Sequence, residues 1–205
     1  MPTPARTSVA AIVQAGRAIL EVERVDGLTM QQVARAVGVR PPSLYKRVRD
    51  RAELVRLIAG DVAQELTVTL DEAAASGNPR DDLRGLANAF RGFARAHPEG
   101  YRLLFARLPD GSGLDPELNA RASAALLRTA AALAGPDHAL EAARTVVAWA
   151  TGFISMELAD AFRLGGDVDR AYAFGIERLA DAIADPADEP GLRQRDARNR
   201  ERQLR

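Results

Sequence analysis

The side chains best suited to chemistry lie in one stretch, residues 28–54, which reads LTMQQVARAVGVRPPSLYKRVRDRAEL. Three of them are consecutive: Tyr45, Lys46 and Arg47, and Lys46 is the only lysine of the chain. A phenol hydroxyl, an ammonium group and a guanidinium group all donate hydrogen bonds to phosphate oxygens. These residue types predict contact with a nucleic acid rather than catalysis.

A short helix has to present these side chains. Pro41 and Pro42 suit the first turn of a helix, where backbone N–H groups have no internal acceptor, so we expect a helix over residues 41–47. Pro42 offers apolar surface to a thymine methyl group, and Ser43 offers a hydroxyl to a base edge. The sequence therefore predicts a rod narrow enough to enter the DNA major groove, which is ~12 Å wide.

A second short helix precedes this rod. Thr29 is a good N-cap for it, and Gly38 ends it with a turn that can adopt positive φ. The side chains that hold the two helices at a fixed angle are apolar: Val33, Ala34, Val37 and Leu44. Two short helices joined by a glycine turn, after an amphipathic helix at residues 8–23, form a helix-turn-helix arrangement.

Helical patterns continue to residue 184, and no segment alternates as a strand does. Caps and breakers divide the remainder into helices over residues 50–75, 81–96, 101–108, 116–134, 137–164 and 167–184. We therefore predict an all-α fold of about nine helices, with a three-helix head and a helical body. The expected domains are a DNA-binding head at 1–56, an effector-binding and dimerisation body at 57–185, and an arginine-rich flexible tail at 186–205.

Charge is distributed unevenly although the net charge is zero. Residues 1–58 hold ten basic and five acidic side chains, residues 59–189 twelve and twenty-one, and residues 190–205 six and two. A basic head on an acidic body suits a protein that presents one end to a polyanion. No apolar run approaches the ~20 residues of a membrane span, so we expect a cytoplasmic protein, nucleoid-associated when bound to DNA, with no membrane partner.

The residue types and motifs of the sequence give little support for an enzyme. The chain has no cysteine, and neither of its two histidines, His97 and His138, has a histidine or carboxylate four residues later. It also lacks a nucleotide-binding glycine loop and a serine elbow motif. We expect no catalytic residue, metal or cofactor. A helical enzyme, or a helical protein–protein adaptor without DNA binding, remains the alternative.

The stretch from residue 8 to residue 56 resembles the DNA-binding domain of the TetR family of transcriptional regulators. Its signature is a threonine-capped helix, a Gly-Val turn, a small hydroxyl residue, Leu-Tyr and a basic pair. The resemblance implies that phosphates are gripped by Thr29, Tyr45, Lys46 and Arg51. It places Arg40, Pro42, Ser43 and Arg47 near bases or the adjoining backbone, and Leu44 in the core. The chain departs from the family at Arg40-Pro41-Pro42, where polar residues are more usual.

A TetR-like body implies a homodimer, because two major grooves on one face of DNA lie ~34 Å apart. We expect the last two long helices, over residues 137–164 and 167–184, to form the dimer interface. The candidate interface residues are Gly152, Met156, Tyr172, Ile176 and Leu179. The segment around Trp149 and Gly152 resembles a C-terminal domain type in which histidine often precedes the glycine, whereas this chain has Thr151. Gly152 either allows two helices to approach closely or is an ordinary small residue of a packed helix.

The resemblance also implies a small-molecule effector bound inside the body. Candidate lining residues are the large apolar ones: Phe90, Phe93, Tyr101, Leu104, Phe105, Leu118, Trp149 and Phe153. A plain core needs the same residues, so packing is the other interpretation of each. We therefore expect a ligand-responsive repressor that binds a palindromic operator in double-stranded DNA.

Overall fold

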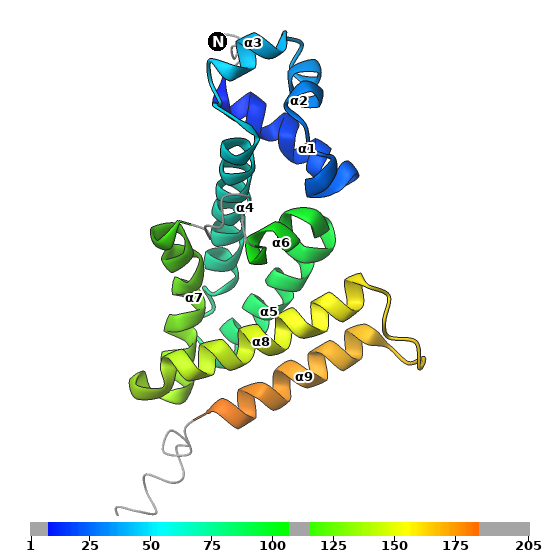
Figure 1. The fold of residues 1–205 in the computed structure, drawn as a ribbon. Helices are drawn as coiled ribbons and strands as arrows, with labels where there is room; N and C mark the ends of the chain where they lie inside the picture. Colours follow the sequence, from blue (N-terminus) through cyan, green and yellow to red (C-terminus); the bar gives the residue numbers. More distant parts are fainter. Residues whose placement is uncertain (1–7, 107–114, 185–205) are drawn as a thin grey trace, which may run out of the picture. The chain divides into compact units, whose positions relative to one another are not determined.

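The computed structural model describes residues 8–106 and 115–184. Within them it contains nine α-helices, one 3₁₀ turn and no strand, which confirms the predicted all-α class (Figure 1). None of these helices is long and apolar enough to cross a membrane. The helices are α1 (Val9–Gly27), α2 (Met30–Ala36), α3 (Pro41–Tyr45), α4 (Arg51–Ala73), α5 (Pro79–Ala96), α6 (Pro98–Phe105), α7 (Pro116–Ala134), α8 (Ala139–Leu158) and α9 (Val168–Ile183), with the 3₁₀ turn at Pro136–His138.

Contacts divide the chain into two compact units. Unit 1 comprises residues 1–69 and 92–123, and unit 2 comprises residues 70–91 and 124–205. The described residues of the predicted head all lie in unit 1. The functional division at residues 56 and 185 stays a prediction, and the predicted tail lies outside the described residues.

Unit 1 is built around α1 and the first part of α4. Ile12 and Leu20 of α1 and Leu54 and Ile58 of α4 are almost completely buried. Gly16 lets the two helices approach, because a Cβ atom there would lie 2.8 Å from the Cδ1 of Ile58. Helix α1 also packs against α2 and α6, and α2 packs against α3. Helix α1 is interrupted at Arg24, whose φ is +60°.

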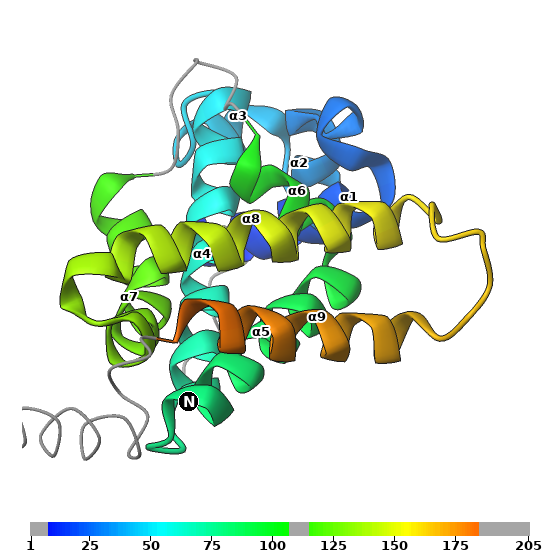
Figure 2. The ribbon, with the colours of Figure 1, turned by 90° about the horizontal axis from the view of Figure 1, so that it is seen from below.

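Unit 2 contains α8 and α9, which run side by side (Figures 1 and 2). Gly175 makes their close approach possible, since a Cβ atom there would lie only 2.1 Å from Cζ2 of Trp149. Trp149 stacks near Phe153 and Tyr172 with ring centroids 5.4 and 5.3 Å away. The predicted helix 137–164 is shorter in the structure: α8 ends at Leu158, and Asp160 follows with a φ of +51°. Asp167 caps α9, accepting a hydrogen bond of 3.1 Å from the Arg170 N–H.

Candidate nucleic-acid interface

Helix α2 begins with a complete capping box. The Thr29 hydroxyl oxygen accepts a hydrogen bond from the Gln32 N–H at 3.3 Å, and the Gln32 side chain accepts one from the Thr29 N–H at 3.0 Å. The Thr29 hydroxyl also donates to Gln32 Oε1 at 2.7 Å. These bonds satisfy donors that the first turn of a helix leaves free. Thr29 is exposed, and its hydroxyl already holds α2 together.

The turn after α2 depends on glycine. Gly38 has a φ of +73°, which disfavours residues with a side chain. The Val39 N–H donates to the Ala34 carbonyl at 2.9 Å and closes the turn. Arg40 is extended and precedes α3, which starts with Pro41 and Pro42 as its first residues.

Helix α3 has one buried edge and a broad exposed surface. Leu44 within it and Val48 just after it are completely buried. Tyr45 is 51% exposed, and Lys46 and Arg47 are exposed as well. The helix ends at Tyr45, two residues earlier than predicted, with Lys46 as its C-cap. Arg40, Pro42 and Ser43 complete the exposed set.

Arg51 has a different environment from the rest of the predicted DNA-binding set. Its Nε donates to the Leu28 carbonyl at 2.7 Å, and Nη2 donates to the Val25 carbonyl. Its guanidinium therefore ties the end of α1 and the loop before α2 to the start of α4. Because its guanidinium is engaged inside the head, a contact of Arg51 with phosphate stays a prediction.

Asp50 caps α4. Its Oδ1 accepts a hydrogen bond from the Glu53 N–H at 2.8 Å, and Glu53 in turn accepts one from the Arg49 N–H at 2.6 Å. The Glu53 N–H, followed by the Arg49 side chain 2.9 Å away, lowers the pKa of Asp50. The hydrogen bond from the Arg49 side chain to Asp50 also raises the pKa of Arg49.

Glu21 was not predicted to have a role. Its carboxylate accepts hydrogen bonds from the N–H groups of Glu99 and Gly100 at the start of α6, at 3.0 and 2.9 Å. The partners lie 78 and 79 positions along the chain and are backbone groups, so no local pattern could signal them.

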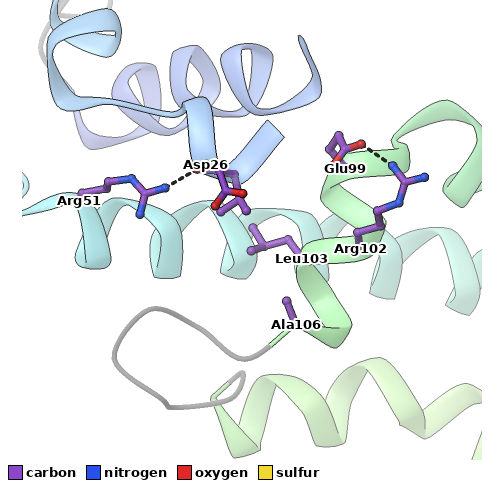
Figure 3. A pocket seen from close by; sticks show the side chains of 7 residues that line it. Asp26, Arg51, Glu99, Arg102, Leu103 and Ala106 are labelled. Atoms are coloured by element: carbon purple, nitrogen blue, oxygen red, sulfur yellow. Dashed lines mark hydrogen bonds and ion pairs between the residues drawn. The ribbon is translucent and has the colours of Figure 1, made fainter. Parts of the chain in front are cut away.

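A cavity of about 320 Å³ lies in unit 1 (Figure 3). Its lining combines the end of α1, the start of α4 and α6, through Val25, Asp26, Arg51, Glu99, Arg102, Leu103 and Ala106. Figure 3 shows Glu99 and Arg102 paired with each other. The lining includes none of the residues predicted to form the effector pocket.

The predicted pocket residues are divided between the units. Phe93, Tyr101, Leu104, Phe105 and Leu118 belong to unit 1, whereas Phe90, Trp149 and Phe153 belong to unit 2. Phe93 and Tyr101 are buried, and Phe105 is half exposed with its ring 5.2 Å from that of Tyr101. Their role in binding an effector stays a prediction. Within residues 8–106 and 115–184, no three acidic or histidine side chains gather where they could hold a metal ion.

Two of the predicted interface residues are buried within unit 2. Tyr172 and Ile176 are 1% and 2% exposed, because they point into the core of unit 2, so neither side chain is available to a second copy. The Tyr172 hydroxyl donates to the Ala87 carbonyl at 2.8 Å. Gly152 and Met156 are exposed, and Leu179 is half-buried.

An all-α chain with an exposed, basic-edged short helix behind a glycine turn has the architecture of a helix-turn-helix DNA-binding regulator. Residues 83–179 match the family described as "Tetracyclin repressor-like, C-terminal domain". The chain is 31% identical over 182 residues to an uncharacterized HTH-type transcriptional regulator of Mycobacterium tuberculosis, covering 86% of this chain and 82% of that one. It therefore belongs to the TetR family of transcriptional regulators, and it is a DNA-binding regulator rather than an enzyme.

Two further relatives cover most of the chain. The class A tetracycline repressor from transposon 1721 of Escherichia coli is 29% identical over 183 residues, covering 88% of this chain and 81% of that protein. A solved structure of a protein with unknown function from Rhodococcus sp. RHA1 superposes with a TM-score of 0.77 at 25% identity, covering 90% of this chain and 100% of that chain. The predicted family and function class are thereby confirmed.

Proposed function

We propose that this protein is a ligand-responsive repressor that binds a palindromic operator as a homodimer, with α3 of each copy in a major groove. The observation that carries the proposal is the surface of α3. Leu44 and Val48 fix it to the head, while Tyr45, Lys46 and Arg47 are exposed side by side. The same proposal puts the protein in the cytoplasm, on the DNA that it regulates.

The two prolines of α3 affect how the helix can read DNA. Pro41 and Pro42 have no N–H group, and the Ser43 N–H donates to the Arg40 carbonyl at 2.9 Å. The backbone at the start of α3 therefore offers no free donor to phosphates. We assign base contact to the side chains of Pro42, Ser43 and Arg47, with Arg40 near the adjoining backbone.

Phosphate contact is assigned to Tyr45 and Lys46. The Tyr45 hydroxyl and the Lys46 ammonium group are exposed at the end of α3, where the DNA backbone rises beside a helix in the groove. Thr29 is exposed at the start of α2 and can add a further contact if its hydroxyl donates to a phosphate oxygen instead of to Gln32 Oε1. Contacts of this kind position a protein on DNA and make its affinity depend on salt.

The dimer interface that we propose is the exposed surface of α8 and α9. Phe174 is 67% exposed, Met156 47% and Val147 36%, and no atom lies within 4 Å of a Cβ atom built on Gly152. Exposed apolar side chains on two adjacent helices suit a four-helix bundle with a second copy. We expect Phe174→Glu to convert the dimer to a monomer in sedimentation experiments, whereas Val22→Glu on α1, where the side chain is 77% exposed, leaves it a dimer.

Ligand response requires a difference in effector affinity between the DNA-binding and released states. A coupling of a few kcal/mol suffices to change operator occupancy by one or two orders of magnitude. Helix α4 runs from the Asp50 cap beside α3 into unit 2, so it is the element that we expect to carry the change.

The experiment that tests the proposal maps the DNA protected upstream of the protein's own gene and measures affinity at several salt concentrations. Operator binding should weaken steeply with salt, with a slope of ~0.9 per phosphate contact. Tyr45→Phe combined with Lys46→Ala should weaken binding to operator and random DNA alike. Arg163→Ala removes one exposed charge in unit 2 and serves as the control. An adaptor without DNA binding would show no saturable binding at any salt concentration.

A further inference from the structure

The first turn of α6 is capped by a residue from another helix. The residue preceding it, His97, makes no capping hydrogen bond with its side chain. Pro98 has no N–H group, the next two N–H groups donate to the Glu21 carboxylate, and the Tyr101 N–H donates to the His97 carbonyl at 2.8 Å. Glu21 of α1 therefore satisfies the two donors of this turn that α6 itself leaves free.

Three helices meet at this point. Gly100 is buried, and a Cβ atom there would lie 3.1 Å from Glu21 Oε1 and 3.3 Å from the Cγ2 of Val62 on α4. Arg24 adds a second link between α1 and α6, with its Nε 3.7 Å from the carboxylate of Glu99. The start of α6 is therefore fixed against the end of α1 by polar contacts as well as by packing.

The end of α1 leads directly to the DNA-reading surface. Arg51 of α4 holds the Val25 and Leu28 carbonyls, and α2 begins at Met30. Helix α3 packs on α2 and follows it after a four-residue connection. A displacement of the start of α6 would thus move the end of α1 through Glu21. Because α1 connects to α3 only through the short helix α2, that movement would also change the orientation of α3.

We propose that Glu21 is the positioning residue that couples the start of α6 to the orientation of α3. This inference rests on the proposed function and adds a residue through which the state of α6 alters DNA affinity. Coupling between two sites is reciprocal, so DNA that holds α3 must also stabilise the Glu21 contacts with Glu99 and Gly100. A glutamine at position 21 keeps one acceptor oxygen and places an NH₂ group against the other N–H, so it breaks half of the cap.

The experiment uses the full chain and a duplex of the protected upstream sequence. Hydrogen–deuterium exchange is measured at the amides of Glu99 and Gly100 with and without the duplex. We expect the duplex to slow exchange in the wild type and to have little effect in Glu21→Gln. We also expect Glu21→Gln to bind the duplex about tenfold more weakly, within the usual range of coupling between sites. A capping bond with a merely structural role would lower stability without changing the response of these amides to DNA.

Glu23→Gln is the matched control, because it removes the same charge from an exposed position of the same helix. It should bind DNA as tightly as the wild type or more tightly, since it removes a negative charge from the head. If Glu21→Gln does not fold, Gly100→Ala keeps the carboxylate and crowds the same contact, and it should show the same loss of coupling. If a folded variant showed wild-type affinity for the duplex and wild-type slowing of exchange, the proposed coupling would be wrong and the proposed function would stand. A wild type that bound no duplex would overturn the proposed function and the coupling with it.

Discussion

Substitution of Arg91 is the most informative single test of what stabilises unit 2. Its side chain is 9% exposed and joins α5 to Glu157 of α8 through two hydrogen bonds of 2.7 and 2.6 Å. A third, of 2.7 Å, reaches Asp169 on α9, and the guanidinium carbon lies 4.7 Å from the ring centroid of Tyr172. The hydrogen bonds to Glu157 raise the pKa of Arg91 further above its ordinary value. One guanidinium thus holds three helices together.

We expect Arg91→Met to lower the free energy of unfolding by about 3 kcal/mol. Removing one partner of a buried ion pair costs about 3–5 kcal/mol, because the other charge stays buried without a counter-ion. The lower end applies since the side chain of Glu157 is 18% exposed and keeps some contact with water. For a chain of this length, 1 kcal/mol shifts the melting temperature by about 2–4 °C, so the variant should melt about 6–12 °C lower.

Urea unfolding followed by circular dichroism measures the effect, at a fixed protein concentration because assembly contributes to apparent stability. The double variant Arg91→Met, Glu157→Leu should be more stable than Arg91→Met alone, since neither charge is then left unpaired. Asp169→Ala removes a partner that is 72% exposed and should cost no more than about 1 kcal/mol. A loss below about 1 kcal/mol in Arg91→Met, or no recovery in the double variant, would refute the reasoning.

Three other substitutions test separate contacts. Gly175→Ala should lower the free energy of unfolding by about 1–3 kcal/mol, because its Cβ would overlap a tryptophan ring. The pKa of Asp50 is lowered in the folded state, so its carboxylate stabilises the fold above about pH 4 and this contribution is lost as the pH falls through the lower folded value. Asp50→Asn keeps an acceptor at the cap and should therefore show a smaller loss of helicity between about pH 5 and pH 2 in circular dichroism. Arg51→Met should lower stability by about 1.5–3 kcal/mol through its lost hydrogen bonds to two carbonyls. Unchanged stability in urea unfolding, with a salt slope reduced by about one contact, would instead assign this guanidinium to a phosphate.

The features that sequence predicted well are those that depend on neighbours along the chain. Thr29 and Asp50 cap helices because a side-chain oxygen can reach an N–H group three residues later. Gly38 forms the turn because positive φ favours glycine. Leu44 is buried and Tyr45 exposed because successive helical residues point in different directions. These local rules were enough to predict the all-α fold and the exposed rod of the head.

What only the tertiary structure decided is which distant groups meet. Glu21, Arg51 and Arg91 are ordinary charged residues in the sequence, and each acquires its role from a partner that lies 23 to 79 positions away. The burial of Tyr172 and Ile176 within unit 2 could not be read from the sequence, because a helix pattern shows that an apolar stripe exists and not which neighbour covers it. Packing settles such choices, since the free energy of burial depends on the surface that is met and not on the residue alone.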